Sequence, residues 1–478
     1  MAIDSRRGGI PALRKVGYGF GTIGFSLPHQ AVATFLIFYA TAILGIPASL
    51  AGIAVAISIA WDAALDPLMG WLSDRAESRR FGRRHQFLLI GGALVALLTY
   101  LLWSIDPSSS ANAKLIRMFV LVLALKTSLT IYVVPYNALG GELTPDYNER
   151  SSIQGMRATF YLVGMVTAIV GGLALFFRST PQFPKGQLNP AAYPPMGAAW
   201  AAITIVAALI VFAATRRYIP VLPKRSETMR HEGGPLASLR ADIAGTFRNR
   251  DFFMLALMMF TIEAGFQFGI TISIHTNTYT YGLTGPKIGL LALVLFACSI
   301  ASQPFWVWFT KRYDKKPALI LGGALALIGF IGAPWAHVWW HLFPIDSPKL
   351  PLTLGMFNVL AGIGNGAFMS VPYAMVADTA DVAEVETGKR EEALYFGMYT
   401  FAYKLGAAVS LVLSGLLLDR IGFIPSSTSQ SDAVRFNLAM TPTYLILITI
   451  PFALWCLSRY RITRERFAEI RARLDKAA

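Results

Sequence analysis

Residues 70–84 read GWLSDRAESRRFGRR, and residues 311–316 read KRYDKK. Each segment is a short turn, rich in basic residues and aspartate, between two long apolar runs. Each turn follows the second apolar run of a set of six, so the chain reads as two halves with the same order. Matching turns in register are typical of membrane proteins that arose by duplication. The two segments therefore predict an all-α polytopic membrane protein with twelve helices in two six-helix halves.

The composition agrees with this prediction. Only 14% of the 478 residues are charged, whereas soluble domains average about 25%. A bilayer core about 30 Å thick is crossed by a helix of about 20 apolar residues. Apolar runs of this length predict spans at residues 16–44, 49–72, 86–104, 116–139, 154–177, 197–216, 252–275, 288–310, 317–336, 351–375, 393–418 and 440–458.

The distribution of basic residues predicts the orientation. Of 42 Lys and Arg residues, 31 fall in the termini and loops on one side of the predicted spans and 8 on the other. Cytoplasmic loops carry such an excess, so we expect both termini in the cytoplasm and, for a bacterial cell, a multi-pass protein of the inner membrane. Lipid headgroups attract this positive charge, so the net charge of +15 needs no nucleic acid as a partner.

The predicted organisation has four parts. Residues 1–216 form the first six-helix half and residues 251–458 the second. Residues 217–250 form a cytoplasmic linker with an amphipathic stretch at 236–247, and residues 459–478 form a basic cytoplasmic tail. The two cysteines lie within apolar runs, so a disulfide framework or a zinc site is excluded by count.

Longer motifs resemble one family. Residues 61–70, WDAALDPLMG, resemble the second-helix signature of the glycoside–pentoside–hexuronide:cation symporters, the melibiose-permease-like branch of the major facilitator superfamily. Residues 135–157 and 377–404 are similar to that family's segments around helices four and five and helices ten and eleven. The resemblance implies alternating-access symport of a glycoside, sugar or sugar acid with a cation, and a protein that works as a monomer without a cofactor.

Charged residues inside predicted spans mark the expected cation site, because such residues are costly in a membrane and usually functional. Asp62 and Asp66 are four residues apart, so their carboxylates share one helix face about 6 Å apart. Lys126 lies about 15 Å deep, too far to reach the headgroups, on the same face as Thr130. A static ion pair is the alternative for this group.

The resemblance implies a role for each of these residues. The aspartate pair corresponds to the family's proton or sodium site, and Lys404 to a lysine that senses this pair. A sodium ion at Asp62 and Asp66 is the only metal site that the sequence leaves open. Because the ammonium of Lys126 competes for the same carboxylates, we expect coupling to protons rather than to sodium.

Other polar residues in the spans are the expected substrate contacts. The resemblance places Arg157 at the sugar cavity, with headgroup contact as the alternative. The family's sugar-binding residues are replaced here by Ser26, Asn137 and Met369. The residues of this chain therefore differ from those of a galactoside site. The polar groups left to contact substrate, each with helix packing as its alternative, are His29, Gln30, Tyr136, Asn137, Glu263 and Gln267.

The loop motifs are the expected conformational switches. Their aspartate and arginine groups pair with neighbouring helix ends in a tight turn, and the predicted switch residues are Asp74, Arg75, Arg83, Asp314, Asp378 and Arg390.

Other functions fit the sequence less well. The family's lysophosphatidylcholine branch shares the aspartate pair and the helix-eleven lysine, so symport of an amphiphile such as a lysophospholipid stays open. The chain has no phosphate-binding loop and no nucleophile–base set, so we do not expect an enzyme. A receptor role does not require so many buried charges.

Overall fold

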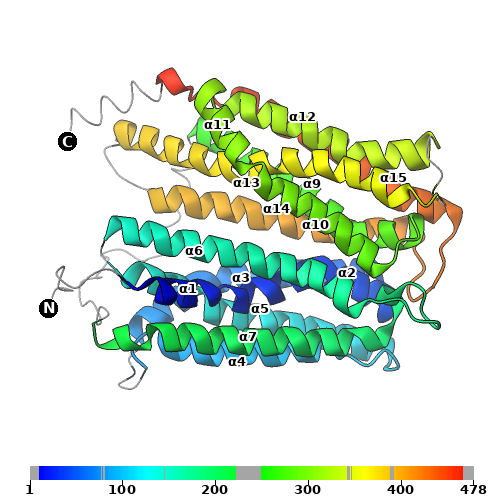
Figure 1. Ribbon diagram of the computed structural model, residues 1–478, viewed down its shortest axis with the longest axis horizontal. Helices are drawn as coiled ribbons and strands as arrows, with labels where there is room; N and C mark the ends of the chain where they lie inside the picture. The colour runs from blue at the N-terminus through cyan, green and yellow to red at the C-terminus, as the bar shows by residue number, and fades with distance from the viewer. Residues whose placement is uncertain are drawn as a thin grey trace. The chain divides into compact units, whose positions relative to one another are not determined.

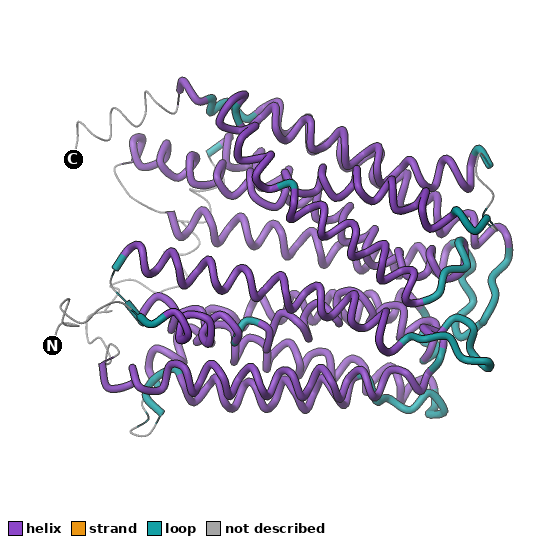
Figure 2. Tube along the Cα trace, viewed as in Figure 1, coloured by secondary structure: helices purple, strands orange, loops and turns teal. Residues whose placement is uncertain are grey.

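The computed structural model describes residues 10–76, 78, 81–144, 146–221, 249–341, 345, 347–387 and 392–466. The described residues form helices joined by short loops, with no strand among them (Figure 2). Twelve of the helical segments are long and apolar enough to cross a membrane. The predicted all-α fold with twelve spans is therefore confirmed.

The chain divides into two compact units. Unit 1 comprises Met1–Arg230, Leu283–Gly289 and Ile424–Ser429, and unit 2 comprises His231–Gly282, Leu290–Phe423 and Gln430–Ala478. The two short later segments join unit 1 through backbone contacts. Gln187 Nε2 donates to the Leu283 carbonyl at 2.9 Å, and Ser426 N donates to the Thr41 carbonyl at 3.0 Å.

Unit 1 contains the first six spans. Its helices are α1 (Ala12–Phe20), α2 (Ile23–Phe38), η1 (Tyr39–Ile43), α3 (Ala48–Arg75), α4 (His85–Leu102), α5 (Ala111–Glu142), α6 (Tyr147–Val166), η2 (Thr167–Phe176), the short η3 (Gly186–Leu188) and η4 (Pro190–Ala192), α7 (Tyr193–Thr215) and η5 (Arg216–Val221).

Unit 2 contains the last six spans. Its helices are α9 (Arg250–His275), η6 (Thr276–Thr280), α10 (Gly285–Ala301), whose first turn belongs to unit 1, α11 (Gln303–Tyr313), α12 (Lys315–Pro334), η7 (Trp335–Trp339), α13 (Leu350–Thr387), α14 (Glu392–Arg420) and α15 (Asp432–Arg459).

The two units pack their helices in the same order. In unit 1, α4 packs against α5 and α7, and α3 packs against α5. In unit 2, the corresponding α12 packs against α13 and α15, and α11 packs against α13. Figure 1 shows α4 beside α7 and α12 beside α15. This repeated packing is what a duplicated six-helix unit predicts.

Glycines allow the third and fourth helices of each unit to approach closely. A Cβ atom added at Gly91 of α4 would lie 2.9 Å from the backbone nitrogen of Tyr132 on α5. A Cβ atom at Gly329 of α12 would lie 2.3 Å from the backbone nitrogen of Ala361 on α13. Small residues at such crossings let apolar helices associate in a membrane.

Several helices extend beyond the predicted spans. The tenth span continues to Val385, and the twelfth begins at Asp432 rather than near residue 440. Ser431 caps the start of α15 by accepting a hydrogen bond from Val434 N, so a polar first turn precedes the apolar run. The predicted amphipathic stretch at 236–247 and the tail beyond residue 466 lie outside the described residues.

Candidate functional site

Asp62 is held by a residue of the neighbouring helix. Thr130 on α5 donates a hydrogen bond from Oγ1 to Asp62 Oδ1 on α3 at 2.7 Å. One residue earlier on α3, Trp61 Nε1 donates to Thr127 Oγ1 at 3.0 Å. These two contacts fix the register of α3 against α5. The structure thus brings together two of the predicted coupling residues, Asp62 and Thr130.

Asp66 and Lys126 lie on either side of this contact. Asp66 follows Asp62 by one turn of α3 and is half-buried. Lys126 precedes Thr130 by one turn of α5, and only 6% of its surface is exposed. The two carboxylates and the ammonium therefore occupy adjacent helices over about two turns.

Lys126 contacts a residue that the sequence had placed with the substrate group. Its Nζ lies 3.3 Å from His29 Nδ1, a ring nitrogen on α2. This contact joins residues 97 apart in the chain. His29 therefore lies beside the predicted coupling residues, and its contact with substrate stays a prediction.

Arg157 and Asn137 form a second polar contact in unit 1. Arg157 on α6 donates from Nη1 to Asn137 Oδ1 on α5 at 2.7 Å. Arg157 lies inside the span Ser152–Phe176 and is half-buried. Among the described residues, no carboxylate lies within ion-pair distance of this guanidinium. Two of the predicted substrate residues are thus adjacent.

Three other candidates in unit 1 make contacts between or along helices. Ser26 is 1% exposed and lies against Gly164 of α6. Tyr136 donates to the Tyr18 carbonyl at 2.7 Å and stacks on the Tyr18 ring at 4.6 Å. Gln30 Nε2 donates to Thr34 Oγ1 at 3.1 Å, one turn along α2. These contacts match the helix-packing alternative, and substrate binding by these three residues stays a prediction.

Unit 2 places Glu263 among tyrosines. Glu263 on α9 is 6% exposed and accepts a hydrogen bond from Tyr403 on α14. Tyr399 and Tyr373 lie close enough to interact with it electrostatically, and their rings meet edge to face at 5.3 Å.

The remaining candidates of unit 2 lie on three helices. Gln267, one turn after Glu263 on α9, donates to Thr271 Oγ1 at 3.3 Å. Lys404 is half-buried on α14, and Met369 on α13 is 37% exposed.

The basic turn of unit 1 is anchored to the end of α5. Arg83 Nη2 and Arg84 Nη2 both donate to Glu142 Oε1, at 2.5 and 2.8 Å. Arg84 is 4% exposed and also donates from Nη1 to Ser73 Oγ on α3 at 2.5 Å. At the start of α4, Arg84 therefore joins Ser73 of α3 to Glu142 of α5.

Arg75 and Asp74 were also predicted for this cluster. The Arg75 guanidinium lies 4.0 Å over the ring of Trp71 on its own helix, and Arg75 is exposed. The side chain of Asp74 is outside the described part of the structure. The pairing with Glu142 therefore involves Arg83, as predicted, and Arg84.

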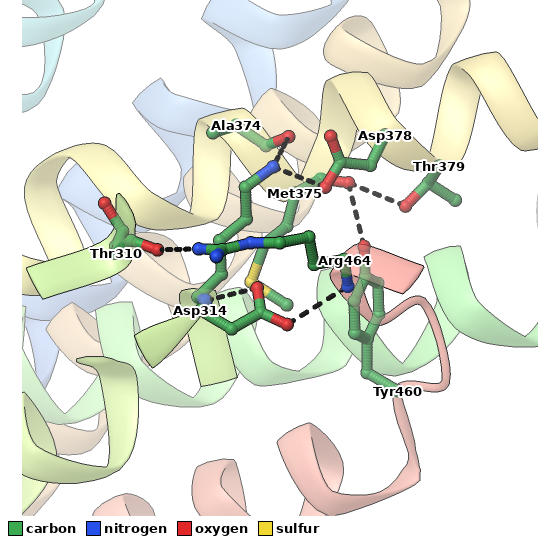
Figure 3. Close-up of polar contacts among 9 residues, drawn as sticks. Thr310, Asp314, Ala374, Met375, Asp378, Thr379, Tyr460 and Arg464 are labelled. Atoms are coloured by element: carbon green, nitrogen blue, oxygen red, sulfur yellow. Dashed lines mark hydrogen bonds and ion pairs between the residues drawn. The ribbon is translucent and has the colours of Figure 1, made fainter. Parts of the chain in front are cut away.

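The basic turn of unit 2 has a similar anchor (Figure 3). Lys315, at the start of α12, forms an ion pair with Asp378 on α13 and donates to the Ala374 carbonyl at 3.3 Å. Asp314 has a φ of 84° and caps α12 by accepting from Lys315 N at 2.6 Å. Arg390, the last predicted switch residue, lies outside the described residues.

The start of the C-terminal tail binds the same turn. Arg464 N donates to Asp314 Oδ2 at 3.1 Å, and its Nη2 donates to the Thr310 carbonyl at 2.7 Å (Figure 3). Tyr460 donates from its hydroxyl to the Met375 carbonyl at 3.3 Å. Burial raises the pKa of Tyr460, so its hydroxyl keeps the proton that this hydrogen bond needs.

Four of the residues in these contacts were not predicted as site residues from the sequence: Arg84, Glu142, Lys315 and Arg464. The internal repeat carries a usable signal for one of them. Glu142 and Asp378 are acidic residues near the same end of the fourth helix of each unit, and each faces the basic turn of its own unit. A search for matching acids in the two halves would have indicated Glu142.

The sequence matches known transporters over most of its length. Residues 17–464 match the MFS/sugar transport protein family. The glucuronide carrier protein homolog of Escherichia coli is 23% identical, with 96% of this chain and 94% of that protein covered. The sodium-dependent lysophosphatidylcholine symporter 1-B of Danio rerio is also 23% identical, with 95% and 87% covered.

Solved structures agree on the fold. The D-xylose-proton symporter superposes with a TM-score of 0.60 at 13% identity, covering 93% of this chain and 99% of that one. A bacterial homolog of the lysosomal transporter Spinster superposes with a TM-score of 0.64 at 14% identity, covering 98% and 99%. With twelve spans, buried membrane charges and this match, the chain is a membrane transporter that belongs to the MFS/sugar transport protein family.

Proposed function

We propose that this chain is a proton-coupled symporter of a sugar acid. The observation that carries the substrate class is Arg157. Its guanidinium lies within a membrane span, donates to the neutral amide oxygen of Asn137, and has no carboxylate partner among the described residues. A guanidinium in such a place is well suited to hold a carboxylate by paired hydrogen bonds. The relation to a glucuronide carrier homolog supports an acidic sugar.

The proposed coupling ion follows from the residues around Asp62. A sodium ion needs several oxygen ligands at short range, and Asp62 with Thr130 supplies only part of such a set. Lys126, one turn away and nearly buried, already brings a positive charge to this region. We therefore propose that the aspartate pair exchanges protons, with apparent pKa values that belong to the coupled group rather than to one residue.

The cellular arrangement is also part of this proposal. The excess of basic residues on one side supports cytoplasmic termini, and the relative from Escherichia coli supports the inner membrane. We propose that the protein acts as a monomer, since each unit of the fold contains its own set of membrane charges.

A binding screen tests the substrate class. The purified protein should gain thermal stability with methyl-β-D-glucuronide and much less with methyl-β-D-glucoside, because only the uronate offers a carboxylate to Arg157. The variant Arg157→Gln should lose this difference. Arg178→Gln is the matched control, since Arg178 is exposed outside the spans. Equal stabilisation by both sugars would contradict the proposed role of Arg157.

Lysophospholipid transport is the second candidate. The lysophosphatidylcholine symporters match this chain at identities similar to the glucuronide carrier homolog, and a phosphate would also suit Arg157. Lysophosphatidylcholine belongs in the same screen, followed by counterflow of the stabilising compound in proteoliposomes. Counterflow of the lysolipid without counterflow of the uronate would replace a sugar acid with an amphiphile as the substrate.

A further inference from the structure

A lysine and a histidine share one contact inside unit 1. Lys126 Nζ lies 3.3 Å from His29 Nδ1, and Lys126 is nearly buried within the fourth span. His29 lies within the first span. Neither the predicted cation site nor the anion-binding role of Arg157 explains this pair.

The chemistry of the two groups limits their protonation. An ammonium only donates hydrogen bonds, so the ring nitrogen that faces it must accept one. The neutral imidazole of His29 does this when Nδ1 has no proton and Nε2 carries one. A proton added at Nδ1 would turn the acceptor into a donor and place two positive charges side by side. With Lys126 charged, the contact therefore requires a neutral His29 whose Nδ1 accepts the hydrogen bond.

Few other charged residues lie on the helix turns around the His29–Lys126 contact. On the helices that pack against α2, the titratable and charged groups of the turns around this contact are Lys126 and Tyr132 of α5, Asp62 and Asp66 of α3, and Arg157 and Tyr161 of α6. Thr130 links this region to the carboxylates, because it lies one turn after Lys126 and donates to Asp62.

We propose that the His29–Lys126 pair is a proton-binding element of the coupling site. A proton taken up from water binds His29 Nδ1, and the two cationic groups separate. The Lys126 ammonium then turns toward the carboxylates one helical turn further along. Loss of the proton from Nδ1 restores the contact seen in the structure. This inference rests on the proposed proton coupling and adds His29 to it as the group that receives the proton.

Histidine spectroscopy tests the pair directly. The full chain, labelled with ¹⁵N-histidine and placed in lipid nanodiscs, has six histidine signals, and the signal lost in His29→Gln identifies His29. In the wild type at neutral pH, we expect a proton on Nε2 and none on Nδ1. In Lys126→Met, the midpoint of the His29 titration should rise by about one pH unit or more, because a neighbouring ammonium no longer opposes the second proton.

Two further lysine variants complete the test of the His29–Lys126 pair. Lys114→Met removes an ammonium whose contact is with the Pro107 carbonyl, so the His29 titration should not change. Lys126→Gln replaces Lys126→Met if the latter is not monodisperse. A wild-type proton on Nδ1, or the same His29 midpoint with and without Lys126, would overturn the proposal. The measurement uses no sugar, so its failure is distinct from a failure of uronate transport or binding.

Discussion

At the residue scale, the proposed coupling mechanism depends on the charged side chains inside the spans. Asp62 keeps its hydrogen bond from Thr130 if it becomes asparagine, because an amide oxygen also accepts, yet its negative charge is lost. We therefore expect Asp62→Asn to reach the membrane but to lose uphill accumulation. Lys404→Ala, which removes a charged side chain from the middle of α14, should have the same effect. The measurement is uptake by vesicles with an imposed proton gradient.

The control for this prediction is a carboxylate outside the spans. The Ser108 hydroxyl and backbone amide hold the pKa of Asp106 below its ordinary value, so this exposed loop residue stays charged at neutral pH. Asp106→Asn should leave accumulation unchanged. Wild-type accumulation in Asp62→Asn or in Lys404→Ala would exclude the coupling mechanism proposed for these residues.

Lys126 carries a separate prediction at this scale. Replacing it with glycine removes the ammonium that stands near Asp62, so the carboxylate pair becomes free to attract another cation. We expect Lys126→Gly to acquire sodium-stimulated uptake that the wild type lacks. Uptake is compared with sodium and proton gradients imposed separately. Strong sodium stimulation of the wild type would argue against proton coupling.

At the element scale, the Arg84–Glu142 pair links three helices of unit 1. Arg84 is almost fully buried and pairs with Glu142. Glu142→Gln removes the negative charge that this guanidinium contacts, and breaking such a buried pair costs about 3 kcal/mol. We expect a clearly lower free energy of unfolding, measured by urea unfolding of the purified protein in detergent.

An exposed ion pair provides the comparison. Arg435 and Asp432 lie 3.2 Å apart, but the Asp432 side chain is 98% exposed. Exposed pairs contribute little, about 0–1 kcal/mol, so Asp432→Asn should change the free energy of unfolding only slightly. If Glu142→Gln and Asp432→Asn lower the free energy of unfolding equally, burial of Arg84 does not make its ion pair stronger than an exposed one.

At the scale of the whole molecule, the two units repeat one plan. In each unit, a basic turn after the second helix pairs with an acid near the end of the fourth helix. Both turns belong to the side where basic residues are concentrated. A green fluorescent protein fused after residue 478 should therefore fluoresce, because it folds in the cytoplasm. Alkaline phosphatase fused there should be inactive, and the opposite result would contradict cytoplasmic termini.

The sequence by itself determined the number of spans and the unusual charges within them. Bilayer thickness fixes the length of an apolar helix, and backbone hydrogen bonds leave few alternatives to helices in a membrane. Twelve apolar runs in the sequence therefore correspond to twelve membrane spans in the described part of the chain. Asp62, Asp66 and Lys126 were identifiable for a related reason, since charge in such a segment is costly and rare.

Tertiary structure alone decided which of these residues meet. In a membrane, lipid and neighbouring helices are both apolar, so periodicity in the sequence does not fix how a helix is rotated about its axis. That rotation depends on close packing, as where Gly91 meets the backbone of Tyr132. The contact of His29 with Lys126, between helices distant in the chain, follows from such packing, and no local pattern of the sequence contains it.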